Sequence, residues 1–353
     1  MTEPFRLEEL ELAKRNHGFP LEALRYPITP AGLHFTLTHY DVPAIDAASW
    51  RLSIGGLVAR PLKLSLEELE SRPSVDVAVT LECAGNGRGR LHPRPFSMPW
   101  LEDGIGTARW QGTPLRPILE EAGVLDDAVE IVFSGPDRGF EGGTEQAFQR
   151  SLTVGEALAG DALLAYEMNG RPLPLQHGFP VRLVVPGWYG MASVKWLVSI
   201  EAVAEPFRGH YQAVAYRVRQ EPDEEGVPVT RMLPRALMIP PGIPSFPERE
   251  RTVDLGECAL EGRAWSGMAA IEAVEVSVDG GEIWVEADLV DDVGSPWAWW
   301  RWLFSWAPDR PGEYELRCRA RDAAGNVQPL EPVQNLGGYV NNAVQRVPVT
   351  VRR

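Results

Sequence analysis

Residues 80–90 read TLECAGNGRGR, the most informative stretch of the chain. An apolar, strand-like run, residues 75–82, leads here into a glycine-rich loop. Cys83 stands at the junction, and Arg88 and Arg90 follow within the loop. Glycines let a backbone approach another group closely, and nearby guanidinium groups favour a thiolate over a thiol. The stretch therefore predicts a reactive or metal-binding thiolate at Cys83, or else a small buried side chain, the commoner role of a lone cysteine.

The chain around this loop is mixed in character up to about residue 227. Apolar runs at residues 129–134 and 181–185, rich in Val and bounded by Gly, Pro or Asp, predict further strands. Short helices are predicted between them from capping-box spacing or from a proline at the start and a glycine at the end. These helices begin after Ser65, Thr113 and Thr153. A motif at residues 134–137, SGPD, predicts a turn in which Asp137 bonds its own backbone.

The amino-acid composition changes at residues 220–247, which are first acidic and then dense in proline. We interpret this segment as an inter-domain connection. Beyond them, a predicted hairpin at residues 273–287 and an alternating run at 314–321 indicate a small β-sandwich. Five tryptophans lie within residues 297–306, and we expect them to provide packing or interface surface. The predicted domains are an N-terminal extension, a catalytic domain and a C-terminal domain, at residues 1–34, 35–227 and 228–353.

The composition of the chain excludes some classes of binding partner. The 353 residues carry a formal net charge of −15, which argues against nucleic acid or an anionic membrane as the main partner. No stretch approaches the roughly 20 apolar residues of a membrane span, and residues 1–12 resemble neither a secretory nor a twin-arginine signal. We therefore expect a cytoplasmic protein. Its three cysteines, Cys83, Cys258 and Cys318, make a disulfide framework improbable, and we expect Cys258 and Cys318 to be free thiols.

Four motifs in order resemble one enzyme family. The N-terminal part of the chain, from about residue 35, resembles the molybdopterin-binding domain of sulfite oxidases and eukaryotic nitrate reductases. The C-terminal part resembles the immunoglobulin-like dimerisation domain of the same family, of the haem-free bacterial type. The motifs are VTLECAGNGRGR (79–90), GTARWQGTPL (106–115), LLAYEMNGRPLPLQHGFPVRLVVPGWYGMASVKWL (163–197) and the C-terminal set AWSG (264–267), VSVDGG (276–281) and NLGGYVNNAVQRVPV (335–349). The resemblance implies an α+β molybdenum-cofactor domain followed by an immunoglobulin-like β-sandwich.

The resemblance also implies roles for individual residues. Cys83 matches the cysteine that binds molybdenum, Tyr216 the tyrosine of the substrate pocket, and Arg88 an arginine near that pocket. A buried phosphate favours Arg and Lys, while imidazoles can satisfy the polar edges of a pterin. Five positions match residues that hold the pterin and its phosphate: His39, Asp137, His177, Arg182 and Lys195. Each of these side chains could also have an ordinary structural role, and we expect Trp100 and Trp110 to pack the domain.

The chain departs from the family at the substrate anchors. Sulfite-oxidising members present several arginines to the oxyanion, and two of these positions are Leu37-Thr38 and Met268-Ala269-Ala270 here; Ala215 also replaces an aspartate before Tyr216. Two cationic anchors are therefore missing. Either Arg88, Arg90 or Arg94 substitutes for them, or the substrate is less anionic than sulfite.

The sequence thus predicts a molybdenum-cofactor oxidoreductase that transfers an oxygen atom, with sulfite as the first candidate substrate and an organic sulfoxide or similar compound as the alternative. We expect a homodimer, a small oxyanion or sulfur-containing substrate, a separate electron acceptor and no haem. Two other classes stay open. A cysteine hydrolase or transferase could use Cys83 with His92 or His177, and a cofactor-less descendant could serve as a binding module.

Overall fold

The computed structural model describes residues 5–353, so the first four residues of the predicted N-terminal extension lie outside it. Strands dominate, and none of the helices in residues 5–353 is both long and apolar enough to cross a bilayer. The α-helices of this part of the chain are α1 (Leu7–Arg15), α2 (Leu66–Glu70), α3 (Leu115–Ala122) and α4 (Val154–Leu158). Single turns of 3₁₀-helix cover Leu21–Arg25, Ala31–Leu33, Arg88–Arg90, Leu175–His177 and Gly190–Ala192, and a π-turn covers His210–Val214.

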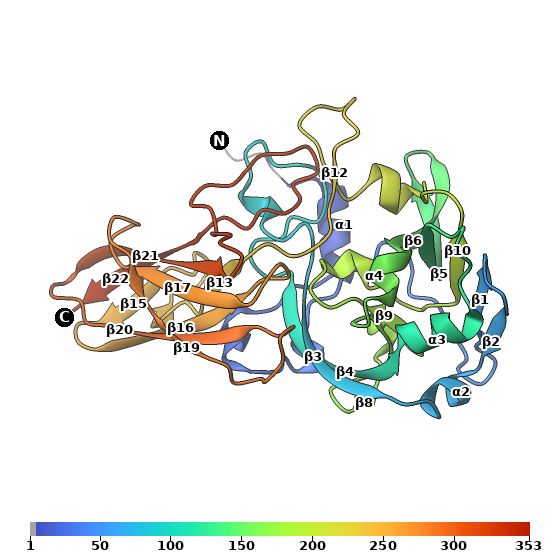
Figure 1. Cartoon of the computed structure of the whole chain (residues 1–353). Coiled ribbons are helices and arrows are strands. Elements are labelled where there is room, and N and C mark those ends of the chain that lie inside the picture. Colours follow the sequence, from blue (N-terminus) through green and yellow to red (C-terminus); the bar gives the residue numbers. More distant parts are fainter. Residues whose placement is uncertain (1–4) are drawn as a thin grey trace.

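Two sheets form the N-terminal half, drawn on the right of Figure 1. The first has the strand order β2 (Leu62–Leu64), β1 (Leu52–Gly56), β10 (Ser199–Val203), β5 (Glu130–Glu141) and β6 (Thr144–Thr153). The second has the order β3 (Val75–Glu82), β4 (Ile105–Pro114), β7 (Leu163–Met168) and β8 (Arg171–Pro172), with β9 (Arg182–Val184) also paired to β7. Cys83 therefore comes directly after the edge strand β3, where residues 75–82 predicted a strand.

The C-terminal half, on the left of Figure 1, also contains two sheets. One has the order β13 (Arg235–Met238), β16 (Cys258–Trp265), β20 (Trp300–Trp306) and β19 (Asp288–Val290). The other has the order β14 (Ile243–Pro244), β15 (Arg251–Asp254), β22 (Gln345–Arg352), β21 (Gly312–Asp322), β17 (Ile271–Ser277) and β18 (Val285–Glu286). A short pair, β11 (Arg217–Val218) with β12 (Val227–Pro228), precedes them.

Local sequence signals explain most helix ends. The side-chain hydroxyls of Ser65 and Thr153 each accept a hydrogen bond from the backbone amide of the glutamate three residues later. Both predicted capping boxes are therefore confirmed. Helix α3 ends at Gly123 in the left-handed conformation, also as predicted, but Pro114 is its N-cap and not its first residue. The turn predicted at residues 134–137 is wrong, although the Asp137 carboxyl does bond its own backbone as expected. Strand β5 continues through these residues to Glu141, with an irregularity in the pairing between Ser134 and Arg138 that redirects the strand.

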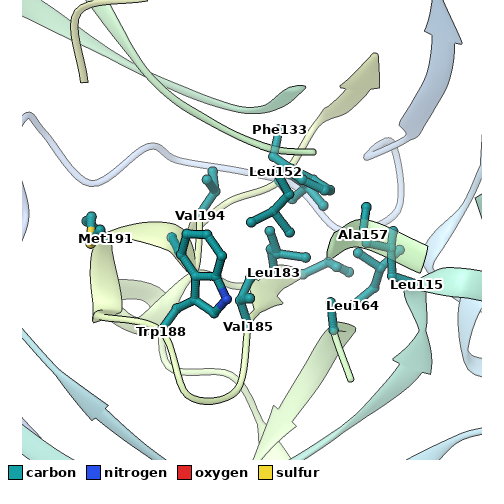
Figure 2. Packing of buried hydrophobic residues seen from close by; sticks show 14 of the residues in the cluster. Leu115, Phe133, Leu152, Ala157, Leu164, Leu183, Val185, Trp188, Met191 and Val194 are labelled. Atoms are coloured by element: carbon teal, nitrogen blue, oxygen red, sulfur yellow. The ribbon is translucent and has the colours of Figure 1, made fainter. Parts of the chain in front are cut away.

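The largest apolar core lies in the N-terminal half and supports the strands behind the site. Figure 2 shows its centre, where Leu183 and Val185 pack near Leu152, Trp188 and Val194. Leu183 and Val194 are fully buried. Because close-packed side chains resist displacement, this core holds strand β9 and the segment after it in a fixed place.

Three of the five tryptophans in residues 297–306 pack inside the protein, which is one of the two roles expected for this run. Trp299 and Trp302 are fully buried, and Trp306 is 5% exposed. Trp302 joins the core between the two C-terminal sheets, whereas Trp299 packs against Phe19 and donates to the carbonyl of Pro27. These three side chains are buried by contacts within one chain, so they cannot form part of an interface between chains.

The segments read as extension and connection are structured. Within residues 220–247, strand β13 is buried and pairs with β16. The segment before residue 35 contacts both halves of the protein. The Leu24 carbonyl accepts a hydrogen bond from Arg263 in the C-terminal half, and His17 forms a β-bridge with Thr36 in the N-terminal half. All three cysteines are free, with Cys258 on β16 and Cys318 on β21 in different sheets.

Candidate active site

Two cavities meet at Cys83. We call the first the inner pocket; seven of the predicted site residues line it: His39, Cys83, Asp137, His177, Arg182, Lys195 and Tyr216. The second, the outer cavity, is lined by Arg88 and shares His39, Cys83 and Tyr216 with the first. Residues from strands β5 and β9, from the loop after β3 and from the segment before β11 therefore converge, although up to 177 positions separate them in the chain.

The inner pocket contains two cations that form no ion pair within residues 5–353, although Lys195 is attracted electrostatically by Asp137 on the same lining. Arg182 is buried and donates to the carbonyls of His177 (3.1 Å) and Ser193 (3.0 Å), and its guanidinium stacks over Trp110. The Lys195 ammonium donates to the carbonyls of Leu37 (2.9 Å) and Gln176 (3.0 Å). Burial lowers the pKa of Arg182 to about 9 and that of Lys195 to about 7. No acidic side chain within residues 5–353 forms an ion pair with either cation, so a bound anion would relieve the cost of burying them.

Polar atoms without partners line the same pocket. His34 Nε2, His177 Nε2 and Asp137 Oδ1 are buried and have no hydrogen-bond partner in the described chain. Burial raises the pKa of Asp137 to about 6, so this carboxyl accepts hydrogen bonds near neutral pH and can also donate below about pH 6. Donors and acceptors of this kind suit the edges of a pterin, and Arg182 with Lys195 suits its phosphate. The side chains of this lining therefore suit the cofactor that the resemblance implies, while the pocket's volume of about 60 Å³ has room for only part of a pterin.

Acid should destabilise the apoprotein through the pocket histidines. Burial lowers the pKa of His34 from 6.5 to about 4, of His39 to about 3 and of His177 to about 2. Below the unfolded-state value the unfolded chain then binds more protons than the folded one, so stability is lost as the pH falls through that range. Each histidine should contribute up to about 1.4 kcal/mol per pH unit. We expect a lower urea midpoint for the apoprotein at about pH 5.5 than at about pH 7.5; equal midpoints would contradict this burial.

Tyr216 stands at the boundary between the two cavities. Its hydroxyl lies 2.7 Å from His39 Nε2, and its ring is tilted against that of Tyr339, 5.2 Å away. The backbone of Tyr216 has φ of 52°, a left-handed conformation that costs energy for a tyrosine and is characteristic of functional sites. Burial raises the pKa of its phenol, so the hydroxyl stays protonated and can donate to a bound substrate.

Arg88 packs directly against the Cys83 loop. Its guanidinium donates through Nε to the Gly337 carbonyl (2.9 Å) and through Nη1 to the Met98 carbonyl (3.1 Å). A Cβ at Gly85 would lie within 2.7 Å of the guanidinium carbon, which explains the glycine there. We predicted that arginine would favour the Cys83 thiolate. Arg88 does act in that direction, but burial outweighs it and raises the pKa of the thiol, so the expectation is wrong for the apoprotein.

The residue before Cys83 is held by the C-terminal half. The Glu82 carboxylate is 1% exposed and accepts bonds from Arg235 (2.8 Å), Trp265 (2.9 Å) and Asn86 (3.0 Å). Arg235 also donates to the carbonyl of Asn341, whose amide in turn donates to the Gly87 carbonyl. The loop with the proposed metal ligand is thus fixed from both sides by charge-assisted bonds.

Of the two positions where the family resemblance implies a substrate-binding arginine, only one lines the cavities. Leu37 does line both cavities, but Met268, 49% exposed, is outside the linings of both, so residues 268–270 offer no anchor position in this chain. Arg90 pairs with Glu102 at 2.8 Å, and Arg94 pairs with Glu9. Neither of these arginines lines the inner pocket or the outer cavity, so of the three candidate substitutes only Arg88 serves the site.

Sequence reasoning missed several residues of the site. His34 was assigned to the N-terminal extension, and Trp100, expected only to pack the domain, lines the outer cavity. Tyr339 also lines this cavity and comes from the C-terminal half. Their one local signal was membership of motifs: NLGGYVNN includes Tyr339, and the cysteine motif is followed closely by Trp100.

The structure does not support the alternative of a cysteine hydrolase, because Cys83 lacks a histidine positioned as its base within residues 5–353. His92 is exposed and lies outside both cavity linings. His177 shares the inner pocket with Cys83, but no histidine in residues 5–353 forms a hydrogen bond with that thiol. A thiol of raised pKa without a base is a weak nucleophile.

Comparison with known proteins identifies both halves. Residues 39–211 match the oxidoreductase molybdopterin binding domain, and residues 243–352 match the Mo-co oxidoreductase dimerisation domain. Mitochondrial sulfite oxidase of Mus musculus is 38% identical over 344 residues, covering 92% of this chain and 62% of the relative. Sulfite oxidase of Gallus gallus is 39% identical, covering 90% and 72%. The chain thus spans a little under two thirds of the mouse protein's length.

A solved structure shows the same fold. The sulfane dehydrogenase SoxCD from Paracoccus pantotrophus superposes with a TM-score of 0.82 and 28% identity, covering 95% of this chain and 86% of that one. The similarity therefore extends through both halves and includes the way in which they are joined. The expected order of a molybdenum-cofactor domain and a dimerisation domain is confirmed.

Proposed function

Since this chain belongs to the sulfite oxidase family of molybdopterin-dependent oxidoreductases, we propose that it oxidises sulfite to sulfate by oxygen-atom transfer. One observation carries this: Cys83 stands where an inner pocket opens into a cavity that contains Arg88. The inner pocket holds two cations, Arg182 and Lys195, that form no ion pair within residues 5–353. The pair of cations suits a phosphate-bearing cofactor, and the cavity with Arg88 suits an oxyanion beside the metal ligand.

Each site residue then has a distinct task. When bound, the molybdenum cofactor supplies the oxygen-transfer and two-electron chemistry. Cys83 would provide the sulfur ligand, while Arg182, Lys195, Asp137 and His177 would hold the pterin and its phosphate. The Tyr216 hydroxyl, positioned by His39 at 2.7 Å, would donate to the substrate oxyanion, and Arg88 would attract it. The buried wall around Cys83 would exclude water and strengthen these interactions.

Metal content and turnover together test the proposal. Purified protein should contain close to one molybdenum per chain and should oxidise sulfite with an added electron acceptor. Neither a cysteine hydrolase nor a cofactor-less binding module predicts the metal. Protein that is folded but binds no molybdenum under metal-replete expression would overturn the assignment of the inner pocket.

A second substrate class has an observation in its favour. Leu37 lines both cavities at a position where the family resemblance implies a cation, and Arg88 is the one candidate arginine of the three that lines either cavity. A charge-assisted hydrogen bond contributes roughly 1.5–3 kcal/mol, so a lost anchor weakens oxyanion binding by at least about tenfold. A sulfur substrate less anionic than sulfite, such as an organic sulfoxide, is therefore the alternative.

The electron path and location follow from the same proposal. We propose that electrons leave to a separate acceptor and that this chain works without haem, since the two matched domains account for most of residues 39–352. The free thiols of Cys258 and Cys318 support a cytoplasmic location. We also propose that the C-terminal half is an immunoglobulin-like sandwich, supported by its two mainly antiparallel sheets and their shared core.

The match to a dimerisation domain leads us to predict a homodimer. Light scattering at micromolar concentration should give twice the 39.1 kDa chain mass, because residues 243–352 match a dimerisation domain and two-fold pairs are the commonest soluble assembly. The contact surface must lie outside Trp299, Trp302 and Trp306, which are buried within one chain. A mass equal to that of one chain would contradict the prediction.

A further inference from the structure

The outer cavity is much larger than a sulfite ion requires. Its volume is about 1030 Å³, and its floor includes Cys83, Arg88 and Tyr216. Cavities that hold whole drug-sized ligands measure about 300–1,000 Å³. Sulfite consists of one sulfur and three oxygens, so it would leave most of this cavity to solvent. The space next to Cys83 can accept a substrate with a sizeable substituent on its sulfur.

The cavity offers one buried positive charge. Its lining holds equal numbers of basic and acidic side chains: Lys14, Arg15, Arg88 and Arg138 against Glu8, Glu11, Asp41 and Glu141. Lys14 is 2.7 Å from Glu11, and Arg138 is 3.6 Å from Glu145, which reduces their attraction for a ligand. Only Arg88 among these cations is buried, and its Nη2 has no acceptor within residues 5–353. Leu37, an apolar residue, is also on this lining, so the cavity holds buried positive charge at Arg88 and suits a ligand with a single negative charge.

Part of the cavity wall is apolar and aromatic. The ring of Tyr339 is tilted against that of Tyr216 with 5.2 Å between the ring centres, and the Arg88 guanidinium lies 5.1 Å from the centre of the Tyr339 ring. Apolar side chains on the lining include Leu37, Met98 and Trp100 inside and Phe96 and Phe140, 53% and 81% exposed, at the rim. Exposed aromatic side chains around a cavity indicate contact with an apolar ligand.

Tyr339 is held firmly in this position. Its amide donates to Asn335 Oδ1 (3.1 Å), and its carbonyl accepts from Asn335 Nδ2 (2.9 Å). Gly338, with φ of 59°, lets the backbone pass over Arg88, whose Cγ would be 2.7 Å from an added Cβ. The C-terminal half thus supplies a fixed aromatic face beside the one buried cation of the cavity.

We propose that the substrate of this site is an organic sulfinate, an anion with a single negative charge and an apolar group on sulfur, and that Tyr339 determines specificity for it. The inference rests on the proposed oxygen-atom transfer. A sulfinate keeps the sulfur lone pair that such transfer needs. The lone pair forms a new sulfur–oxygen bond and no bond to carbon breaks; with water as the net oxygen source, the sulfonate, two protons and two electrons result. The electrons pass to an external one-electron acceptor, ferricyanide in the assay.

The experiment compares substrates on molybdenum-replete holoenzyme. Benzenesulfinate, sulfite and methyl phenyl sulfoxide are assayed with ferricyanide, and binding of the product benzenesulfonate is measured by calorimetry. We expect kcat/KM for benzenesulfinate to exceed that for sulfite. Tyr339→Ala should weaken benzenesulfonate binding by roughly threefold to tenfold, the range for loss of one aromatic contact. Leu37→Arg should shift the preference towards sulfite by about tenfold and steepen its dependence on ionic strength.

Phe246→Ala is the matched control, because this aromatic is 89% exposed and lies outside both cavities. It should change neither the substrate preference nor sulfonate binding. Preference for sulfite with unaltered sulfonate binding in Tyr339→Ala would overturn the inference and leave the proposed function standing. Preference for the neutral sulfoxide would overturn it too, because Arg88 would then have no anion to bind. Full molybdenum with no turnover of any of the three would instead count against the proposed function itself.

Discussion

Cys83→Ser should reduce oxygen-atom transfer by several orders of magnitude while the pterin stays bound. Serine replaces a soft, strongly donating sulfur with a hard and mostly protonated hydroxyl. The pterin contacts proposed for Arg182 and Lys195 are separate from the thiol and should persist. The measurement is kcat on protein whose molybdenum and pterin contents have both been determined. Wild-type turnover by a fully loaded Cys83→Ser protein would remove Cys83 from the role of metal ligand.

Cys258→Ser makes a suitable control for this experiment. Cys258 is also a free thiol, half-buried on β16 and away from both cavities. Its exchange should leave turnover and cofactor content unchanged. If both serine variants lose activity equally, general damage to the protein is the cause, and the comparison then says nothing in favour of a ligand at position 83.

Arg235→Ala should cost about 3–5 kcal/mol of folding stability, the usual result of removing one partner from a buried ion pair. Arg235 and Glu82 are 3% and 1% exposed and lie 2.8 Å apart, so the Glu82 carboxylate would remain buried without its countercharge. Because Glu82 directly precedes Cys83, cofactor retention should fall as well. Urea unfolding and molybdenum content, measured on the same sample, test the two effects.

The chain offers a matched exposed pair. Arg249 lies 2.9 Å from Glu22, and these side chains are 57% and 38% exposed. Arg249→Ala should cost no more than about 1 kcal/mol, because water and salt screen such pairs. The double variant Glu82→Gln with Arg235→Met removes both buried charges and should recover part of the lost stability. Equal losses for Arg235→Ala and Arg249→Ala would show that the buried pair contributes nothing special.

Local features of this chain could be predicted because their causes lie within a few residues. The strand before Cys83, both capping boxes and the end of α3 at Gly123 depend on side-chain alternation, a hydroxyl three residues from an amide, and a left-handed glycine. The eight site residues were named through motif resemblance, and the structure brings them to two adjoining cavities. Their roles towards the cofactor stay predictions.

Only the tertiary structure decided the partners of the charged residues. Arg88, Arg90 and Arg94 share one short segment, yet Arg88 lines the outer cavity while Arg90 and Arg94 pair with Glu102 and Glu9. Arg235 meets Glu82 across 153 positions, and no local pattern encodes such a pairing. An ion pair forms wherever packing brings two charges together, and packing depends on every element of the fold at once. Sequence alone therefore determined many of the local elements and the chemistry available to the site, whereas the fold determined that Arg88 lines the outer cavity and that Tyr339 lies beside it.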